Sequence, residues 1–241
     1  MKKLFCLKTI LRFVIVFCVV FTLIGCGGET VDPTTVNWRT IQIGNTYVFG
    51  AYEQDNNTSN GKEEIEWQVL AKEGTKILVV SKYALDCKPY NASYKSVTWE
   101  TCTLRKWLNE DFYNTAFSQG EKAKIKETSV SADKNPNYST NPGNATIDNV
   151  FLLSITEVKQ YFPNDTASRC AFTAYAKAQG VYTNSSYTVD GKTTCWWWLR
   201  SPGNYPICAA GVDYDGSVDY GGKCVNYVYS VRPALWIDLA S

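Results

Sequence analysis

Hydrophobic and polar residues alternate with a period of two in the first part of the chain, a pattern typical of β-strands. Thr46–Tyr52 is rich in aromatic residues, and Ile65–Leu70 alternates around a tryptophan. Lys76–Ser81 contains a run of aliphatic residues, and the Glu73-Gly74 pair before it is typical of a hairpin turn. We therefore expect one strand followed by a β-hairpin in this region.

The pattern changes to a helical period in the middle of the chain. Apolar residues recur mostly on one face between Leu104 and Phe117, and Thr103 can cap this helix. An alanine-rich segment, residues 167–179, predicts another helix that ends at Gly180. Two further helix starts are indicated by pairs with the spacing of a capping box: Ser118 with Glu121, and Ser154 with Glu157.

Two long polar segments, residues 128–147 and 182–194, are predicted to be loops, and loops of this length are often functional. Between them, residues 148–153 predict a buried strand. The helices are too few and too clustered for alternating βαβ units. We therefore expect a single α+β domain over residues 38–241.

The C-terminal stretch has two apolar ends with a polar segment between them. Cys195–Gly203 and Val231–Asp238 predict buried strands, and the three adjacent tryptophans of the first bury a large apolar area when packed. The segment between them, residues 204–230, is rich in Tyr, Asp, Asn and Gly. Tyrosine offers a large contact area at a small entropy cost, and short polar residues offer adaptable hydrogen bonds. We expect this segment to form a binding face on a rigid frame.

The first residues indicate a targeting segment. Basic residues precede an apolar run, residues 13–24, which is too short for a membrane span. The run ends in Leu23-Ile24-Gly25-Cys26, which is similar to a bacterial lipobox. We expect a signal peptide over residues 1–25, lipidation of Cys26 and a flexible tether over residues 26–37. These features predict a lipid-anchored protein of the cell envelope that is exposed at the surface, in the outer membrane if the source has two membranes.

Composition narrows the chemistry. Histidine is absent, so Ser-His-Asp and Cys-His catalytic sites and His-ligated zinc sites are excluded. Removal of residues 1–25 would leave 24 − 4 = 20 basic and 23 acidic residues, and no charge run suggests nucleic acid. We expect no cofactor. Six cysteines would remain besides Cys26, and the sequence leaves open whether and how they pair: Cys87, Cys102, Cys170, Cys195, Cys208 and Cys224.

Four blocks in this order resemble a family of bacterial exported domains of unassigned function: Trp99–Asn109, Val150–Ser154, Trp197–Gly203 and Val231–Leu235. That family looks like the formylglycine-generating-enzyme branch of the C-type lectin fold. The resemblance covers nearly all of the mature chain. It implies a single C-type lectin-like domain with long loops.

Within that family, the chain is most similar to the variable lipoproteins of diversity-generating retroelements. There, adenine-directed mutagenesis of AAC codons yields residues such as Asn, Tyr, Asp, Ser, Gly and Cys, but never Glu, Gln, Lys, Met or Trp. Residues 204–230 fit this restriction except at Lys223. The resemblance implies a constant frame of Val212, Gly216, Val218, Gly221 and Val225. It implies these variable, ligand-binding positions: Asn204, Tyr205, Ile207, Cys208, Asp213, Tyr214, Asp215, Asp219, Tyr220, Cys224, Asn226, Tyr227, Tyr229 and Ser230.

The prediction is a surface-anchored, monomeric, adhesin- or receptor-like binding protein without catalysis. Its partner would be a protein or glycan on another cell or host surface, and it would contact a membrane through its lipid anchor but no nucleic acid. The segment can also be read as an ordinary Tyr- and Gly-rich hairpin surface that is not diversified.

Two other function classes remain as alternatives. An oxidase like the formylglycine-generating enzyme would need a short-spaced, copper-binding cysteine pair, which Cys195, Cys208 and Cys224 do not offer in sequence. A calcium-dependent glycan-binding lectin domain could use the closely spaced acids of residues 213–219. Such aspartates are more often turn residues, and Asn135-Pro136-Asn137 only partly resembles a sugar-binding loop.

Overall fold

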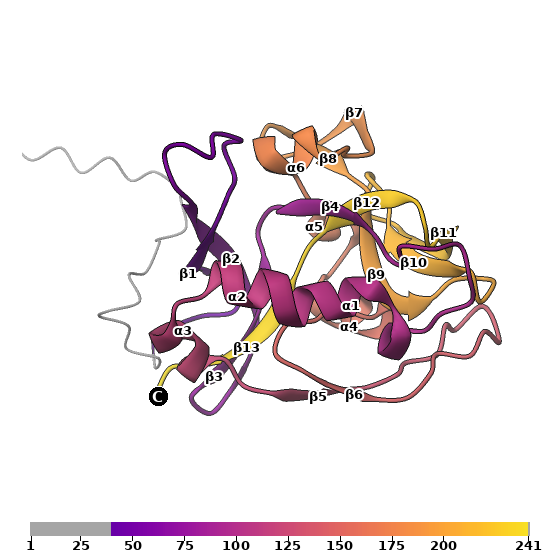
Figure 1. Ribbon diagram of the computed structural model, residues 1–241, viewed down its shortest axis with the longest axis horizontal. Coiled ribbons are helices and arrows are strands. Elements are labelled where there is room, and N and C mark those ends of the chain that lie inside the picture. Colours follow the sequence, from indigo (N-terminus) through magenta and orange to yellow (C-terminus); the bar gives the residue numbers. More distant parts are fainter. Residues whose placement is uncertain (1–39, 241) are drawn as a thin grey trace, which may run out of the picture.

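The computed structural model describes residues 40–240, which form two main β-sheets with helices packed between and beside them (Figure 1). The first sheet is antiparallel, and its strands lie in the order β1 (Thr46–Tyr52), β2 (Glu63–Glu73), β3 (Lys76–Ser81) and β13 (Ala234–Asp238). The predicted strand and hairpin are confirmed. Because the last strand pairs with β3, the first and last strands of the described chain are the two edge strands of one sheet.

The second sheet is mixed. Its order is β11 (Val218–Cys224), β10 (Cys208–Val212), β9 (Trp197–Pro202), β12 (Val228–Val231) and β4 (Asp86–Pro89). Only the β9–β12 pair of this sheet is parallel. The expectation of one strand over Val231–Asp238 was wrong. The chain leaves the second sheet at Arg232-Pro233 and enters the first, because proline has no amide hydrogen to continue a ladder.

The helix predicted over residues 104–117 is confirmed, with a π-helical turn in its middle. It comprises α1 (Thr103–Trp107), η2 (Leu108–Phe112) and α2 (Tyr113–Ala116), and it follows the short η1 (Trp99–Thr101). It crosses the front of the molecule in Figure 1. The cap is Cys102 rather than Thr103: the Cys102 sulfur accepts from the Arg105 amide (3.4 Å), whereas the Thr103 hydroxyl accepts from the Ala92 amide (2.9 Å).

Both predicted capping boxes are present. Ser118 and Ser154 start α3 (Gln119–Lys124) and α4 (Ile155–Tyr161), and each serine accepts from an amide of the turn it caps. The alanine-rich helix, by contrast, is broken into α5 (Asp165–Ser168) and α6 (Ala174–Ala178). The chain between these helices is extended because Ala171 forms one bridge, to Thr194 of the later segment, and its carbonyl accepts from the Ala84 amide (2.9 Å).

The segment 182–194 is not a loop. It forms most of a hairpin, β7 (Thr183–Val189) and β8 (Lys192–Cys195), joined by Asp190-Gly191 with φ values of 50° and 73°. Two positive φ values in a two-residue turn match the twist of the strands. The long loop before it carries the short pair β5 (Thr128–Val130) and β6 (Thr146–Asp148). Between the end of β6 and residue 153, only Phe151 forms a β-bridge, so residues 148–153 are not a continuous strand.

The three tryptophans that begin the C-terminal stretch are fully buried. Trp196 and Trp198 lie on one face, where their rings meet edge to face at 4.8 Å. Trp197 lies on the other face, 5.0 Å below the guanidinium of Arg232. Successive residues of a strand point to opposite faces, so β9 is covered by packed side chains on both sides.

The four blocks that carry the family resemblance are hydrogen-bonded to one another. The Asn109 amide donates to the Val150 carbonyl (2.9 Å), and Phe151 and Ala234 exchange backbone hydrogen bonds of 2.9 and 2.8 Å. The buried Arg200 donates to the Leu152 carbonyl (2.9 Å). Blocks that lie far apart in sequence therefore form one connected interior.

The expected signal peptide, Cys26, the tether and the domain start at Trp38 lie outside the described residues. None of the helices between residues 40 and 240 combines the length and hydrophobicity that a membrane crossing needs.

The contact of β10 with Trp196 can be tested with one methyl group. A Cβ added at Gly211 would overlap the indole ring of Trp196, whereas a Cβ at Gly120 in α3 would meet nothing within 4 Å. We expect Gly211→Ala to lower the free energy of unfolding by about 1–3 kcal/mol through overpacking. Gly120→Ala should leave it unchanged or raise it by up to about 1 kcal/mol. Urea unfolding measures both, and equal stabilities of the two variants would contradict the packing described.

A tyrosine-rich candidate binding face on the β10–β11 hairpin

The hairpin of β10 and β11 forms one edge of the second sheet and lies at the right of Figure 1. Ala209 pairs with Lys223 and Gly211 with Asp219, so Lys223 and Asp219 project from the same face despite the irregular register between them. Gly222 makes this irregularity: its φ is 71°, and a Cβ there would overlap the Ala209 carbonyl. The bulge thus aligns one polar face along the edge of the sheet.

The structure places the fourteen candidate positions at three depths. Tyr205, Asn226 and Tyr227 are exposed, and Tyr205 and Tyr227 keep 61% and 54% of their surface. Tyr229 and Ser230 are buried, at 9% and 0%. The remaining positions are half-buried: Asn204, Ile207, Cys208, Asp213, Tyr214, Asp215, Asp219, Tyr220 and Cys224.

The expectation that Tyr229 and Ser230 are displayed was wrong. The Tyr229 ring packs 4.5 Å from Trp196 and 5.3 Å from Trp198. The Ser230 hydroxyl lies 3.7 Å from the Cys87 sulfur, in the interior. Both residues belong to β12, and these side-chain contacts, rather than the neighbouring strands β9 and β4, cover them. Of the expected frame, Val212, Gly216, Val218 and Val225 are buried and Gly221 is half-buried.

Tyrosines from other segments lie beside the hairpin. Tyr214 packs 6.3 Å from Tyr182 and 5.3 Å from Tyr187, and Tyr182 in turn packs 5.7 Å from Tyr229. Sequence reasoning missed Tyr182 and Tyr187 because it assigned their segment to a loop. The Asp190-Gly191 pair is the signal that could have revealed this hairpin.

A third tyrosine from outside residues 204–230, Tyr94, lies near the Cys208–Cys224 end of the hairpin. Desolvation raises the pKa of Tyr94, with further contributions from the adjacent Cys224, Cys208 and Tyr227. Tyr94 is itself exposed. We call the surface formed by Tyr94, Tyr182, Tyr187, Tyr214 and Tyr227 the tyrosine face.

Not all candidate tyrosines join the tyrosine face. Tyr220 follows Asp219 directly in β11, so it points to the opposite side of the strand and packs against the core. Tyr205 is exposed before β10, and among the described residues its ring contacts none of Tyr182, Tyr187 and Tyr214. The structure therefore joins Tyr214 to Tyr182 and Tyr187 by ring contacts and places Tyr227 near Tyr94. Both Tyr182 and Tyr227 act on the pKa of Tyr229, which lies between the two groups, whereas Tyr205 and Tyr220 are apart from the ring cluster.

Three aspartates of the same hairpin, Asp213, Asp215 and Asp219, accept hydrogen bonds from neighbouring polar groups. Asp219 accepts from the Lys223 ammonium (2.9 Å), the Gly222 amide (2.9 Å) and the Trp196 indole (3.4 Å). Burial acts to raise the pKa of Asp219, but the hydrogen bonds from Lys223 and Gly222 outweigh it and lower the pKa. Burial raises the pKa of Asp213, and the Tyr214 amide offsets this only in part. The pKa values of these two carboxyls are therefore shifted in opposite directions.

Asp213 and Asp215 have the contacts of turn residues. Asp213 accepts from the Tyr214 amide (2.7 Å), and Asp215 accepts from the Ser217 amide (2.9 Å) and hydroxyl (2.7 Å). These local bonds engage one carboxylate oxygen of each aspartate and are the contacts that turn aspartates make. The hairpin aspartates are therefore explained by the turn between β10 and β11.

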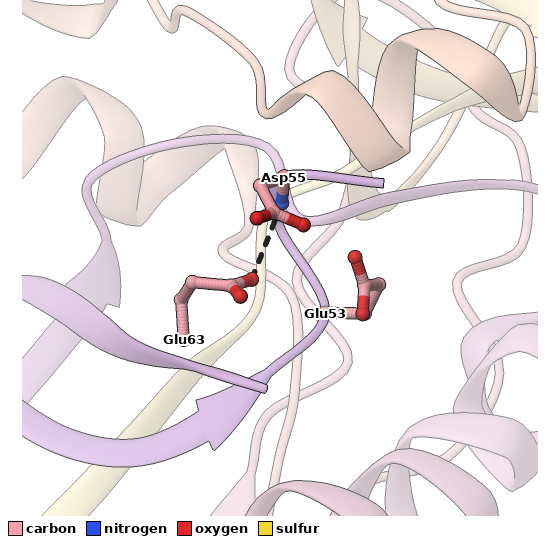
Figure 2. Close-up of side chains that lie close together, drawn as sticks. All are labelled: Glu53, Asp55 and Glu63. Carbon is pink, nitrogen blue, oxygen red and sulfur yellow. Dashed lines mark hydrogen bonds between the residues drawn. The ribbon is translucent and has the colours of Figure 1, made fainter. Parts of the chain in front are cut away.

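Among residues 40–240, the three acidic side chains whose oxygens all lie within 4.8 Å of one another are not on this hairpin. Glu53, Asp55 and Glu63 surround the loop between β1 and β2 (Figure 2). Glu63 accepts from the Gln54 and Asp55 amides (2.6 and 3.2 Å), and Glu53 accepts from the Asn57 amide (2.8 Å). These carboxylates hold the loop in place, and sequence reasoning did not single them out.

Two isosteric variants test the electrostatics of the hairpin. The folded-state pKa of Asp219 is lowered, so its contribution to stability is present above the unfolded-state pKa and is lost as the pH falls through the folded-state pKa. We expect Asp219→Asn to cost about 1 kcal/mol at neutral pH and to match the unsubstituted chain in acid. The pKa of Asp213 is raised, so its contribution is present in acid and is lost as the pH rises.

Asp213→Asn is the matched control, because it should be at least as stable as the unsubstituted chain at neutral pH. Urea unfolding at about pH 3 and pH 7, on either side of the usual carboxyl range, gives both differences. The same pH dependence in the two variants would contradict the opposite shifts.

Comparison with protein-family models matches residues 74–239 to a family described as a domain of unknown function, DUF6273. The match begins at the β2–β3 turn and ends just after β13, so it includes the whole second sheet. Comparisons with curated proteins and with solved structures found no significant match. Because the matched region covers more than half of the 241 residues, the chain belongs to the DUF6273 family.

Proposed function

We propose that this chain is an adhesin- or receptor-like protein that binds a protein or glycan through the tyrosine face and the polar positions of the β10–β11 hairpin, without catalysis. The observation that carries the proposal is the contrast in burial across this hairpin. Val212 and Val218 are buried on one side, while Tyr214 and Asp219 remain half-exposed on a surface continuous with Tyr182. Aromatic anchors with a polar rim are typical of binding sites.

The rigidity of the support favours this role. The Tyr214 ring contacts both Tyr182 and Tyr187, and Tyr182 packs on Tyr229, which itself packs on Trp196. Side chains held in this way lose little conformational freedom when a ligand binds. The Asp219–Lys223 ion pair supplies both charges beside the rings. Such a surface suits a partner with apolar and polar groups side by side.

We also propose that the α+β architecture is a C-type lectin-like fold of the formylglycine-generating-enzyme type. Two features support this. The four blocks of the family resemblance are joined by hydrogen bonds between Asn109, Leu152 and Ala234 and their partners. The first and last strands of the described chain, β1 and β13, lie in one sheet, and the second sheet and the helices come between them in sequence.

The anchor belongs to the proposal as well. A lipidated Cys26 followed by a tether would attach the domain to a membrane of the cell envelope just before β1. In Figure 1, β1 and the β10–β11 hairpin lie at opposite sides of the molecule. An anchor on the β1 side would thus leave the tyrosine face directed away from the membrane and open to a partner.

The two alternative functions have less support. Cys195 is buried, and desolvation with a contribution from Cys224 raises the pKa of Cys208 to about 11. A thiol with so high a pKa supplies little thiolate for copper or for catalysis at neutral pH. The calcium alternative depended on hairpin aspartates whose oxygens accept hydrogen bonds within the turn.

Diversification of the segment leads to a prediction at the level of DNA. If residues 204–230 are rewritten at adenines, the interior positions Tyr229 and Ser230 must stay constant. Substitution of Tyr229 would disturb the packing of Trp196 and Trp198, and Ser230 is fully buried beside Cys87. We expect a near-copy of the DNA for residues 198–235, close to a reverse transcriptase gene, that differs only at adenines. Sequencing of sister loci should find variation at Tyr214 and Tyr227 but not at Tyr229. Variation at Tyr229 as frequent as at Tyr227 would contradict this division.

Binding through the tyrosine face can be tested with a phage-displayed peptide library selected on the immobilised domain. We expect most independently selected peptides to lose tenfold or more in affinity, about 1.4 kcal/mol, for Tyr214→Ala and Tyr227→Ala. Ile43→Ala is the matched control, since Ile43 is an exposed apolar residue beside β1. Unfolding curves of each variant verify that the fold persists. Peptides that bind all three variants equally would count against the proposal.

A further inference from the structure

Two cysteines face each other across the β10–β11 hairpin. Cys208 pairs with Cys224 in the antiparallel register, at the end of the hairpin nearest Tyr94. Both are half-buried, so a reagent in solution can reach them. The family resemblance implies that both are variable positions, but neither the family match nor the tyrosine face gives their sulfurs a role.

The backbone around the pair identifies its type. The amide of Cys208 donates to the Tyr205 carbonyl (2.9 Å), and its carbonyl accepts from the Gly203 amide (2.8 Å). The strands are joined at this point by the neighbouring bond from the Val225 amide to the Ile207 carbonyl (2.9 Å). Cys208 and Cys224 are thus a non-hydrogen-bonded pair, the closer of the two kinds.

Cα atoms in such a pair lie about 4.5 Å apart, and disulfides span Cα separations of about 4.4–6.8 Å. The side chains have room, because Gly203 stands beside Cys208 and a Cβ there would lie 2.8 Å from the Cys208 Cβ. We propose that Cys208 and Cys224 form a cross-strand disulfide that closes the β10–β11 hairpin.

The oxidant is a disulfide donor, RSSR, either a small molecule or a protein. The thiolate of one cysteine attacks a donor sulfur and releases the first RS⁻, which leaves a mixed disulfide. The second thiolate attacks the cysteine sulfur of that mixed disulfide and releases the second RS⁻. One S–S bond forms and one breaks, the two cysteines are oxidised, the donor is reduced, and the two thiol protons end on the two released RSH molecules.

The same environment makes the bond resist reduction. Desolvation, with a contribution from Cys224, raises the pKa of Cys208 to about 11. A thiol of high pKa is a poor leaving group in thiol–disulfide exchange, so attack that expels Cys208 is slow. The pair therefore has the character of a structural bond rather than of a redox switch.

The other cysteines of the described chain lack this combination. Cys170 and Cys195 are also neighbours, but both are fully buried, and the Cys195 amide donates to the Cys170 carbonyl (2.9 Å). Their sulfurs lie near backbone carbonyls, 3.1 Å from Ala171 and 3.4 Å from Cys170. Cys87 and Cys102 are buried as well. These four thiols serve as internal controls.

Peptide mapping tests the linkage on the full chain. The folded protein is incubated with oxidised glutathione, denatured with an alkylating agent to block free thiols, and digested with trypsin. Cleavage after Arg200 and Lys223 places Cys208 and Cys224 in different peptides. We expect these two peptides to be recovered joined, with a mass equal to their sum less two hydrogens, and to separate on reduction. The four buried cysteines should carry the alkyl group.

A variant and a stability measurement complete the test. In Cys208→Ser, Cys224 has no partner and should retain one glutathione. Reduction should lower the unfolding temperature of the oxidised chain but leave that of Cys208→Ser unchanged. The proposal is overturned if the two peptides are recovered separately, each alkylated or glutathionylated, or if either cysteine is joined to one of the buried four. The inference does not rest on the binding proposal, because the linkage is measured without any ligand.

Discussion

The packing of three consecutive tryptophans at the start of β9, with Trp196 just before the strand, is the constraint on which the rest of the structure depends. Trp196 and Trp198 require partners on one face, which Tyr229 and the bare backbone of Gly211 provide. Trp197 requires a partner on the opposite face, which Arg232 provides. A shift of β9 by one residue would exchange the two faces and leave every one of these contacts unmade. The three tryptophans therefore set the register of the second sheet, because no other side chains there would cost as much free energy to misplace.

Two buried arginines connect this strand to the remainder of the molecule in different ways. Arg200 forms an ion pair with Glu157, so the charge of β9 is balanced by α4. Arg232 donates instead to the carbonyls of Ser81 (2.9 Å) and Ser168 (3.3 Å) and lies over the Trp197 ring. A buried charge is tolerated only where polar partners and ring faces replace water. Each guanidinium therefore holds several distant segments at fixed positions.

Short sequence patterns correctly predicted the features that depend only on neighbouring residues, such as helix caps. The capping serines Ser118 and Ser154 were readable because a cap involves only neighbours in sequence. The break at Pro233 was not, because an apolar run looks the same whether it serves one sheet or two. The inward orientation of Tyr229 was also hidden, since it depends on packing against Trp196 and Trp198, which are about thirty residues away in sequence. The hairpin of β7 and β8 was missed for a different reason: polar composition outweighed the turn signal of Asp190-Gly191.

The boundary between the interior and the tyrosine face explains how one short segment can serve two purposes. Between Cys208 and Ser230 the chain alternates between positions that the tryptophans require and positions that they do not touch. Tyr229 and Tyr227 are the same residue type two positions apart, yet one is buried against Trp196 and the other is exposed. What separates them is the edge of the covered area, not their chemistry. Replacement of Tyr227 changes what the surface can contact, whereas replacement of Tyr229 changes what supports that surface. The proposed recognition can therefore vary without loss of the fold only on the outer side of this boundary.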